Sequence, residues 1–226
     1  MFTAFLLSAI SDHTVAQITA PIALTAKAKQ RLQASSREAE AALIKQALAG
    51  DQSAYAALVR RYNRMVFGLV LQMLGNREDA LEVTQDAFLK AFRFLGSYRG
   101  ESRFSTWLYH IARTSAINRL RRVRRDIIAL DAPEAAVRQM TASMADGHDV
   151  LVSSEQTDML LRALQLLRPD DGTVLRLFYM QEQSLEEICK IMDWTMSNAK
   201  SRLCRARQRL RQVLEAHFAE ELTEWV

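Results

Sequence analysis

Basic, amide and hydroxyl side chains share one face of a helical stretch near the C-terminus. They are Ser197, Asn198, Lys200, Ser201, Arg202 and Arg205. The opposite face is an apolar stripe of Ala199, Leu203, Ala206 and Leu210, the pattern of an amphipathic helix. Near the start of such a helix, polar groups can donate hydrogen bonds to phosphates. The guanidinium group of Arg or the amide group of Asn can reach base edges in the major groove. These residues therefore favour recognition of duplex DNA.

A short helix and a turn are expected just before this basic stretch. Ser184 and Glu187 match a capping box, in which each side chain satisfies a backbone amide at the helix start. One buried stripe follows at helical spacing, made of Leu185, Ile188, Cys189 and Met192. Asp193 and Trp194 then make a turn, and Thr195 caps the basic helix. We interpret the segment as a helix-turn-helix; the alternative is an ordinary amphipathic hairpin of two helices.

Aromatic and basic side chains gather in a second stretch, residues 88–122. The aromatic residues are Phe88, Phe92, Phe94, Tyr98, Phe104, Trp107 and Tyr109. The polar residues Ser102, Arg103 and Ser105 lie in the aromatic bend, and Arg113, Asn118, Arg119, Arg121 and Arg122 follow on a helix. Stacking surfaces beside a basic track suit the unpaired bases of a single strand or a base extruded from a duplex. For Phe88, Phe92 and Trp107 we expect a core role.

Charge is segregated along the chain although the formal net charge is only +4. Residues 113–125 and 190–211 are strongly basic, whereas residues 126–158 and the tail after Arg211 are acidic. A single run of charge is often only a solvated face. Two basic blocks, each at the end of a helical segment, could both neutralise phosphates.

Composition favours an all-α fold. The 226 residues include only 7 Gly and 3 Pro, so long stretches lack helix breakers. Cys189 and Cys204 are too few for a disulfide scaffold, and we expect both to be reduced and Cys189 to be buried. No apolar run is long enough to span a bilayer, so we expect a cytoplasmic protein without direct membrane insertion.

Helix signals divide the chain into two small helical domains joined by a flexible acidic linker. Residues 38–125 are expected to hold four helices, and residues 158–226 to hold the helix-turn-helix and an acidic tail, with residues 126–157 as the linker. The expected boundaries in the first domain are a start at Glu38, a stop at Gly50, a cap at Asp51 or Ser53, a stop at Gly75, a start at Asn76, a stop at Gly96 and a start near Phe104. Residues 1–37 lack the basic region of a secretion signal and are expected to be a flexible extension.

Ordered motifs in both domains resemble the extracytoplasmic-function (group four) sigma factors of bacterial RNA polymerase, within the sigma-70 family. The matching stretches are Leu58–Tyr62, Gly75–Ala80, Thr84–Phe92, Tyr98–Ser102, Phe104–Tyr109, Ile111–Arg113, Ser184–Ile188 and Lys200–Arg207. The resemblance implies sigma region 2 at residues 38–125 and sigma region 4 at residues 158–226.

The resemblance implies a role for each block. The β′ clamp of core polymerase would bind Asp79, Glu82, Gln85, Asp86, Phe88 and Leu89. The minus-ten element would be melted and read by Ser102, Arg103, Phe104, Ser105, Trp107, His110, Arg113, Thr114, Asn118, Arg119 and Arg122. The minus-thirty-five element would be read by Thr195, Ser197, Asn198, Lys200, Ser201, Arg202 and Arg205.

Partners and chemistry follow from the same resemblance. The expected partners are core RNA polymerase, at its β′ clamp and β flap, promoter DNA and an anti-sigma factor. The acidic linker would pass through the active-site and RNA-exit channel of the polymerase. No catalytic residue, cofactor or metal is implied, so the expected role is that of a non-catalytic initiation factor.

Several positions depart from the family's pattern. His110 stands where members often have Arg, Thr114 where they often have Asn, and Cys204 where His or Phe is frequent. Glu182 and Asp193 stand where Gly is common, at turns where a positive φ would favour Gly. We expect the minus-ten preference and the geometry of both turns to differ as a result.

Two rival functions remain open at the level of sequence. A stand-alone helix-turn-helix regulator would bind duplex DNA tightly without polymerase, but it leaves residues 76–125 unexplained. An enzyme acting on nucleic acid would need a catalytic constellation. The sequence shows no phosphate-binding Gly loop, no HExxH motif and no paired carboxylate site with a nearby His.

Overall fold

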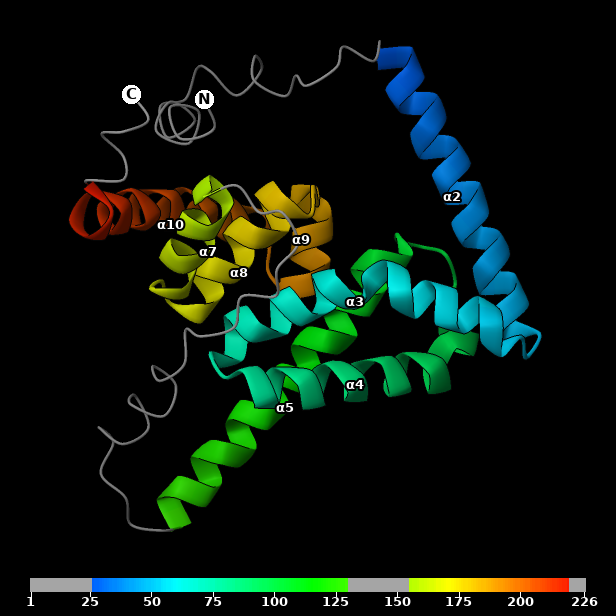
Figure 1. Ribbon diagram of the computed structural model, residues 1–226, viewed down its shortest axis with the longest axis horizontal. Helices are drawn as coiled ribbons and strands as arrows, with labels where there is room; N and C mark the ends of the chain where they lie inside the picture. Colours follow the sequence, from blue (N-terminus) through cyan, green and yellow to red (C-terminus); the bar gives the residue numbers. More distant parts are fainter. Residues whose placement is uncertain (1–25, 130–154, 220–226) are drawn as a thin grey trace.

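The structure is a computed structural model that describes residues 26–129 and 155–219, and every regular element in those ranges is a helix. The first module (residues 26–129) consists of α2 (Ala26–Leu48), α3 (Gln52–Leu74), α4 (Arg77–Phe94), the 3-10 turn η1 (Leu95–Ser97) and α5 (Phe104–Ala129). The second module (residues 155–219) consists of α7 (Glu155–Gln165), α8 (Pro169–Leu175), the π-helical turn η2 (Arg176–Met180), α9 (Leu185–Met192) and α10 (Met196–His217). The predicted all-α class is confirmed (Figure 1).

Local capping chemistry sets the helix boundaries of the first module. Asp51 caps α3, because its Oδ1 accepts from the amides of Ser53 at 2.8 Å and Ala54 at 3.3 Å. Gly75 ends α3 with a φ of 70°, the left-handed conformation that glycine adopts without a steric penalty. Asn76 then caps α4 by accepting from the amide of Asp79 at 2.9 Å. Asp51 thus resolves the open choice with Ser53, and the boundaries predicted at residues 75 and 76 are confirmed.

Two predicted boundaries need correction. Helix α2 begins at Ala26, well before the predicted start at Glu38, because residues 26–37 are rich in Ala, Lys, Gln and Arg and contain neither Gly nor Pro. Part of the predicted flexible extension is therefore helical. Helix α5 continues to Ala129 and α7 begins at Glu155, so both ends of the predicted linker are helical. Residues 1–25, 130–154 and 220–226 lie outside the described residues.

The first module is built around α3, which contacts α2, α4 and α5. Its buried side chains include Leu58, Val66 and Leu69, which are at most 1% exposed. Helix α5 contributes Phe104 and Tyr109, the largest fully buried side chains of the module. Burial of each such side chain stabilises the fold by about 1.5–3 kcal/mol. The apolar face of α5 therefore fixes this helix to the module.

The helix-turn-helix of the second module forms as predicted. Ser184 and Glu187 make both hydrogen bonds of the capping box, and Thr195 accepts from the amide of Asn198 at 3.3 Å. Asp193 lies at the turn with a φ of 55°, and Glu182 has a φ of 48° before α9. Both residues therefore adopt the positive φ that favours Gly, although neither is a glycine. The predicted stripe of α10 is buried, and it comprises Ala199, Leu203, Ala206 and Leu210.

Both cysteines are free thiols, and neither is fully buried. Cys204 is exposed. Cys189 is only partly buried, which corrects the prediction that it lies in the core. The stripe of α9 is instead completed by Ile191, which is fully buried beside Ile188 and Met192.

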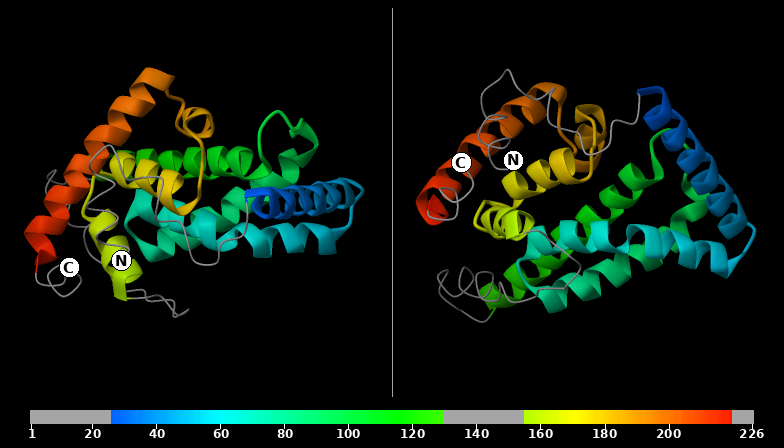
Figure 2. Two further views of the ribbon diagram at one scale, coloured as in Figure 1. Left: turned by 90° about the horizontal axis from the view of Figure 1, so that it is seen from above. Right: turned by 45° about the horizontal axis from the view of Figure 1, so that its top comes forward.

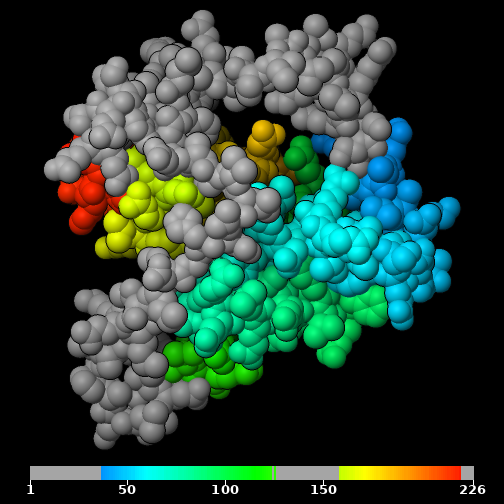
Figure 3. Space-filling model, in the orientation of Figure 1, coloured from blue at the N-terminus to red at the C-terminus, as the bar shows by residue number. Residues whose placement is uncertain are grey.

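The two modules pack against each other, which the sequence did not predict. Helix α8 contacts α3, and α9 contacts α5 (Figures 1 and 2). Their buried apolar side chains belong to one cluster that runs through both modules. In the space-filling view the yellow surface of the second module adjoins the cyan and green surface of the first (Figure 3).

Candidate nucleic-acid interface

The polar face of α10 is open to solvent. Ser197, Lys200, Ser201 and Arg205 are exposed, and the Thr195 cap lies at the start of the same face. The helix is fixed by its buried stripe and by an ion pair between Arg209 and the buried carboxylate of Asp171 on α8. The arrangement offers hydroxyl groups and cations on a rigid helix, which is what docking in a major groove needs.

Two predicted base-reading residues of α10 are engaged within the module. Arg202 donates from Nε to Oδ1 of Asn198 at 2.9 Å, and its Nη1 lies 3.3 Å from Oδ2 of Asp170. Its guanidinium also stacks 4.6 Å from the ring centre of Trp194. Arg202 and Asn198 therefore brace the start of α10 in this structure, whereas Arg205 remains on the exposed face.

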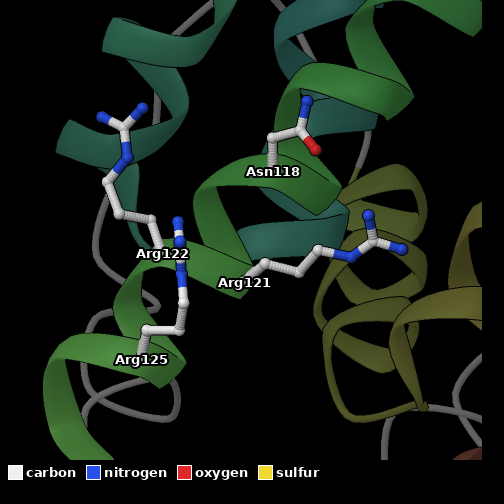
Figure 4. A pocket seen from close by; sticks show the side chains of 4 residues that line it. All are labelled: Asn118, Arg121, Arg122 and Arg125. Carbon is white, nitrogen blue, oxygen red and sulfur yellow. The ribbon is translucent and has the colours of Figure 1, made fainter. Parts of the chain in front are cut away.

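A basic groove lies on the C-terminal half of α5. Four side chains line a hollow of about 620 Å³, namely Asn118, Arg121, Arg122 and Arg125. Arg122 and Arg125 reach from one side of the helix and Arg121 from the other (Figure 4). The predicted minus-ten residues include Asn118 and Arg122. Arg121 was predicted only as part of the basic track on this helix, and Arg125 only as part of the basic block at residues 113–125. Closely spaced guanidinium groups in a concave surface suit a phosphate backbone.

Acids of the second module contact the start of α5 and the residue before it. Arg103 Nε lies 3.0 Å from Oε1 of Glu187. Arg113 Nη1 lies 3.1 Å from Oδ2 of Asp193, and His110 Nε2 lies 3.5 Å from Oδ1 of the same carboxylate. Three predicted minus-ten residues therefore contact the helix-turn-helix, and Arg113 retains only 12% of its side-chain exposure.

Several predicted minus-ten residues support the core of the first module. Phe104 and Ser105 are buried, and Trp107 is partly buried. Phe104 packs at ring-centre distances of 5.5–5.6 Å in a cluster with Tyr62, Tyr98 and Trp107. Phe104 and Ser105 therefore lie in the core of this structure and not on its surface, and the aromatic contacts stabilise the bend. Ser102, partly buried, accepts from Tyr98 Oη through its backbone oxygen at 2.8 Å, and Thr114 is exposed.

Arg119 joins α5 to α4. Its Nη2 lies 2.5 Å from Oδ1 of Asp79 and 3.8 Å from Oε2 of Glu82. A predicted minus-ten residue is therefore paired with two predicted polymerase-binding residues.

The outer face of α4 is acidic and apolar. Glu82, Gln85, Asp86 and Leu89 are exposed together with Leu81. Phe88 is 8% exposed, which confirms its expected core role, and Phe92 is 47% exposed, which corrects its assignment to the core. Leu81, Leu89 and Phe92 add exposed apolar area to the acids, a mixture typical of protein interaction sites.

No cluster of three His, Cys, Asp or Glu side chains in the described ranges is placed to hold a metal ion. Across residues 26–129 and 155–219, no helix is long and apolar enough to cross a membrane.

Each module matches a known protein family. The family described as Sigma-70 region 2 matches residues 58–126, and the family described as Sigma-70, region 4 matches residues 157–210. The chain is 36% identical to the ECF RNA polymerase sigma factor SigW of Bacillus subtilis over 177 residues, which cover 76% of this chain and 94% of the relative. It is 34% identical to the ECF RNA polymerase sigma-E factor of Haemophilus influenzae over 179 residues, which cover 77% of this chain and 94% of that relative.

Solved structures share the fold. The sigma factor RpoE, in complex with the anti-sigma factor NepR from Bartonella quintana, superposes with a TM-score of 0.62 at 20% identity, covering 72% of this chain and 98% of that one. CnrH, in complex with the cytosolic domain of CnrY, superposes with a TM-score of 0.54 at 22% identity. The match covers 79% of this chain and 99% of that one.

Proposed function

The chain belongs to the extracytoplasmic-function sigma factors of RNA polymerase, and we propose that it directs core polymerase to promoters by reading a minus-ten and a minus-thirty-five element. The observation that carries the proposal is the presence of two separate basic surfaces on one chain. These are the exposed face of α10 and the arginine groove of α5. A single helix-turn-helix regulator would need only the first of them.

The α10 face suits the minus-thirty-five duplex. Lys200 and Arg205 are exposed at helical spacing beyond a capped helix start, so they can enter a major groove without rearrangement of the helix. The α5 groove suits the phosphates that flank the minus-ten element, where Asn118 adds hydrogen-bonding capacity beside the arginines. The protein acts by binding and positioning, and the cytoplasm is where it meets polymerase.

The α4 face suits the β′ clamp of core polymerase. Its exposed acids Glu82 and Asp86 would meet a basic partner, with Leu89 beside them to bury apolar area. The second module would bind the β flap of core polymerase. The acidic segment between the modules would pass through the active-site and RNA-exit channel of the polymerase. An anti-sigma factor is the proposed inhibitor, since both similar solved structures are complexes with a partner, NepR being named as an anti-sigma factor.

Reconstituted transcription tests the proposal. Core polymerase and this protein are incubated with a pool of genomic fragments, and the transcript starts are mapped. We expect starts that share two upstream elements, and core polymerase alone is the control. Absence of promoter-specific RNA would contradict the proposed function.

A second experiment tests the α4 assignment. Asp86→Arg reverses an exposed charge and leaves the core of the module intact. We expect about tenfold weaker binding to core polymerase, because a like charge at a complementary surface is unfavourable. Glu38→Arg, an exposed acid on α2, is the matched control. Equal binding of both variants would remove α4 from the interface.

A further inference from the structure

Four side chains form a polar cluster at the start of α10, which we call the Arg202 cluster. Its members are Asp170 in the first turn of α8, Trp194 in the turn before α10, and Asn198 and Arg202 on α10. Arg202 donates from Nε to Oδ1 of Asn198 at 2.9 Å, and its Nη1 lies 3.3 Å from Oδ2 of Asp170. The same guanidinium group stacks 4.6 Å from the ring centre of Trp194. Contacts with three side chains therefore fix its position.

The partners of Arg202 are themselves held in place. The Trp194 ring packs against the buried apolar cluster of the protein. Asp170 lies on a short helix that is joined to α10 by the ion pair between Asp171 and Arg209. A planar guanidinium group loses little freedom when it stacks on a ring and pairs with a carboxylate. Arg202 is therefore a fixed part of the helix-turn-helix surface.

The bond to Arg202 determines how the amide group of Asn198 is oriented. Arginine has N–H donors and no acceptor, so only the oxygen of the amide can face Arg202. The amide nitrogen Nδ2 is left for another partner. No residue in the described ranges accepts a hydrogen bond from it, and it is not buried. Asn198 therefore presents a donor to its surroundings while its acceptor is engaged.

Asn198 lies on the stripe of α10 that faces solvent. Ser201 and Arg205 follow it three and seven residues later, at helical spacing, and both are exposed. Asn198 is the third residue of α10. In docked helix-turn-helix proteins, the first residues of the recognition helix contact base edges in the major groove. The Nδ2 group is therefore placed to meet a base of the proposed minus-thirty-five duplex.

A donor beside a cation discriminates between the two purines. Guanine offers two acceptors in the major groove, N7 and O6, whereas adenine offers the acceptor N7 beside the donor N6 amine. An unengaged asparagine reads adenine with its oxygen and its nitrogen together. In the Arg202 cluster the oxygen lies 2.9 Å from Nε of Arg202, so the N–H groups of the adenine amine would approach a cation. That approach is unfavourable, and guanine is favoured.

We propose that Arg202 sets the base preference of α10 through Asn198. By holding the oxygen of the amide, Arg202 makes Asn198 a donor that selects guanine over adenine at one base pair. Arg202 is a positioning residue in this arrangement, and Asn198 contacts the base. The inference rests on the proposed function, since it places α10 in the major groove of a minus-thirty-five duplex.

NMR spectroscopy of the full chain tests the cluster without DNA. A hydrogen bond to Asn198 protects the Nε proton of Arg202 from exchange with solvent. We expect Asn198→Ala to abolish this protection. Gln212→Ala is the matched control, because it removes an exposed amide side chain from the same helix. Unchanged protection in Asn198→Ala, or an equal loss in Gln212→Ala, overturns the cluster.

Selection from a promoter pool tests the base preference. The probe is a promoter found by transcript mapping, with every base pair of its minus-thirty-five element randomised. Fragments bound by core polymerase and the full chain are sequenced. For the parent chain we expect one base pair at which guanine is enriched about five- to tenfold over adenine. Arg202→Met removes the donor and keeps an unbranched side chain, and we expect adenine to gain at that base pair alone.

A charge control accompanies Arg202→Met. Arg211→Met removes an equal charge from an exposed pair with Glu215, whose Oε1 lies 2.7 Å from Nε of Arg211. We expect it to weaken binding of all fragments alike, without a change in base preference. Circular dichroism verifies that both variants retain their helix content. The same shift toward adenine in both variants overturns the role of Arg202.

Asn198→Asp distinguishes the proposal from direct reading of guanine by Arg202. Aspartate has the size of asparagine and can keep the bond to Arg202, but it offers acceptors only. An acidic side chain accepts from the N4 amine of cytosine, so we expect cytosine to replace guanine at the same base pair. Guanine enrichment that persists in Asn198→Asp shows that Arg202 reads the base itself, and it overturns the proposal.

The remaining outcomes separate this inference from the proposed function. Uniform weakening of all fragments by Arg202→Met and Asn198→Asp indicates phosphate contacts, and it overturns base reading by Asn198. Absence of any enriched fragment with the parent chain contradicts the proposed function and, with it, base reading by Asn198. The protection of the Arg202 Nε proton still decides whether Arg202 holds the amide of Asn198.

Discussion

Helices α5 and α10 carry similar basic sequences but differ in what their charges contact. On α10, Lys200 and Arg205 lie on an exposed face. On the N-terminal half of α5, His110 and Arg113 lie against the carboxylate of Asp193, and further along Arg119 pairs with Asp79. The comparison teaches that a basic run predicts a binding surface only where no acid of the same chain reaches it.

The difference has a cause in packing. Both helices contact three neighbours. Helix α10 packs on α7, α8 and α9, and its apolar stripe leaves Lys200 and Arg205 exposed. Helix α5 packs on α3, α4 and α9, and Asp193 at the end of α9 lies against His110 and Arg113, which leaves the Asn118–Arg125 segment as the open basic surface of α5. The position of the neighbours' acids, rather than the number of neighbours, therefore decides which basic side chains remain exposed.

The largest expected effect separates a core aromatic of α5 from a surface aromatic of α4. Phe104→Ala should lower the free energy of unfolding by about 3–5 kcal/mol, because Phe104 is 1% exposed within the aromatic cluster. Phe94→Ala is the control, since Phe94 is 58% exposed and its loss should cost less than about 1 kcal/mol. Urea unfolding measures both. Equal stabilities would mean that Phe104 is a surface residue of the kind the sequence suggested.

A smaller effect is expected on the open face of α10. Arg205→Ala should weaken binding of the minus-thirty-five duplex by about 1–3 kcal/mol and relax specificity at one base pair, if Arg205 reads a base edge. Lys200→Ala should weaken binding to all duplexes alike, as expected for a phosphate contact. Fluorescence anisotropy with matched and mismatched duplexes distinguishes the two. Unchanged affinity in both variants would remove the assignment of this face.

The smallest effect concerns the ion pair within the first module. A double-mutant cycle of Arg119→Gln and Asp79→Asn should give a coupling free energy of about 0.5–1 kcal/mol for folding, since the pair is only partly buried. The corresponding cycle on Arg211 and Glu215 of α10 should give about 0.3–0.5 kcal/mol, as for exposed pairs one turn apart. Additive effects at Arg119 and Asp79 would release Arg119 for a role in DNA binding.

Signals within a few residues predicted much of the fold. The capping box at Ser184 and a cap of α3 at Asp51 or Ser53 were evident from the side chains, because these interactions span at most three residues. The buried stripe of α10 followed from its helical period. The alternation of apolar and basic residues therefore sufficed to locate the helix-turn-helix.

Contacts between distant residues were not predictable in this way. The approach of Gly68 to Arg176 joins residues on different modules, and no local period indicates it. The same limit applies to Phe104 and Arg119, whose types suit DNA but whose partners lie on other helices. The sequence identified candidate side chains, and tertiary packing decided which of them face solvent.

Arginine labelling of the free full-length chain tests the contrast between α5 and α10 most directly. A dicarbonyl reagent modifies accessible guanidinium groups, and peptide mass spectrometry gives the rate at each site. We predict slow labelling of Arg113, whose side chain is 12% exposed, and fast labelling of the exposed Arg205. Equal rates at the two arginines in the parent chain would contradict the account.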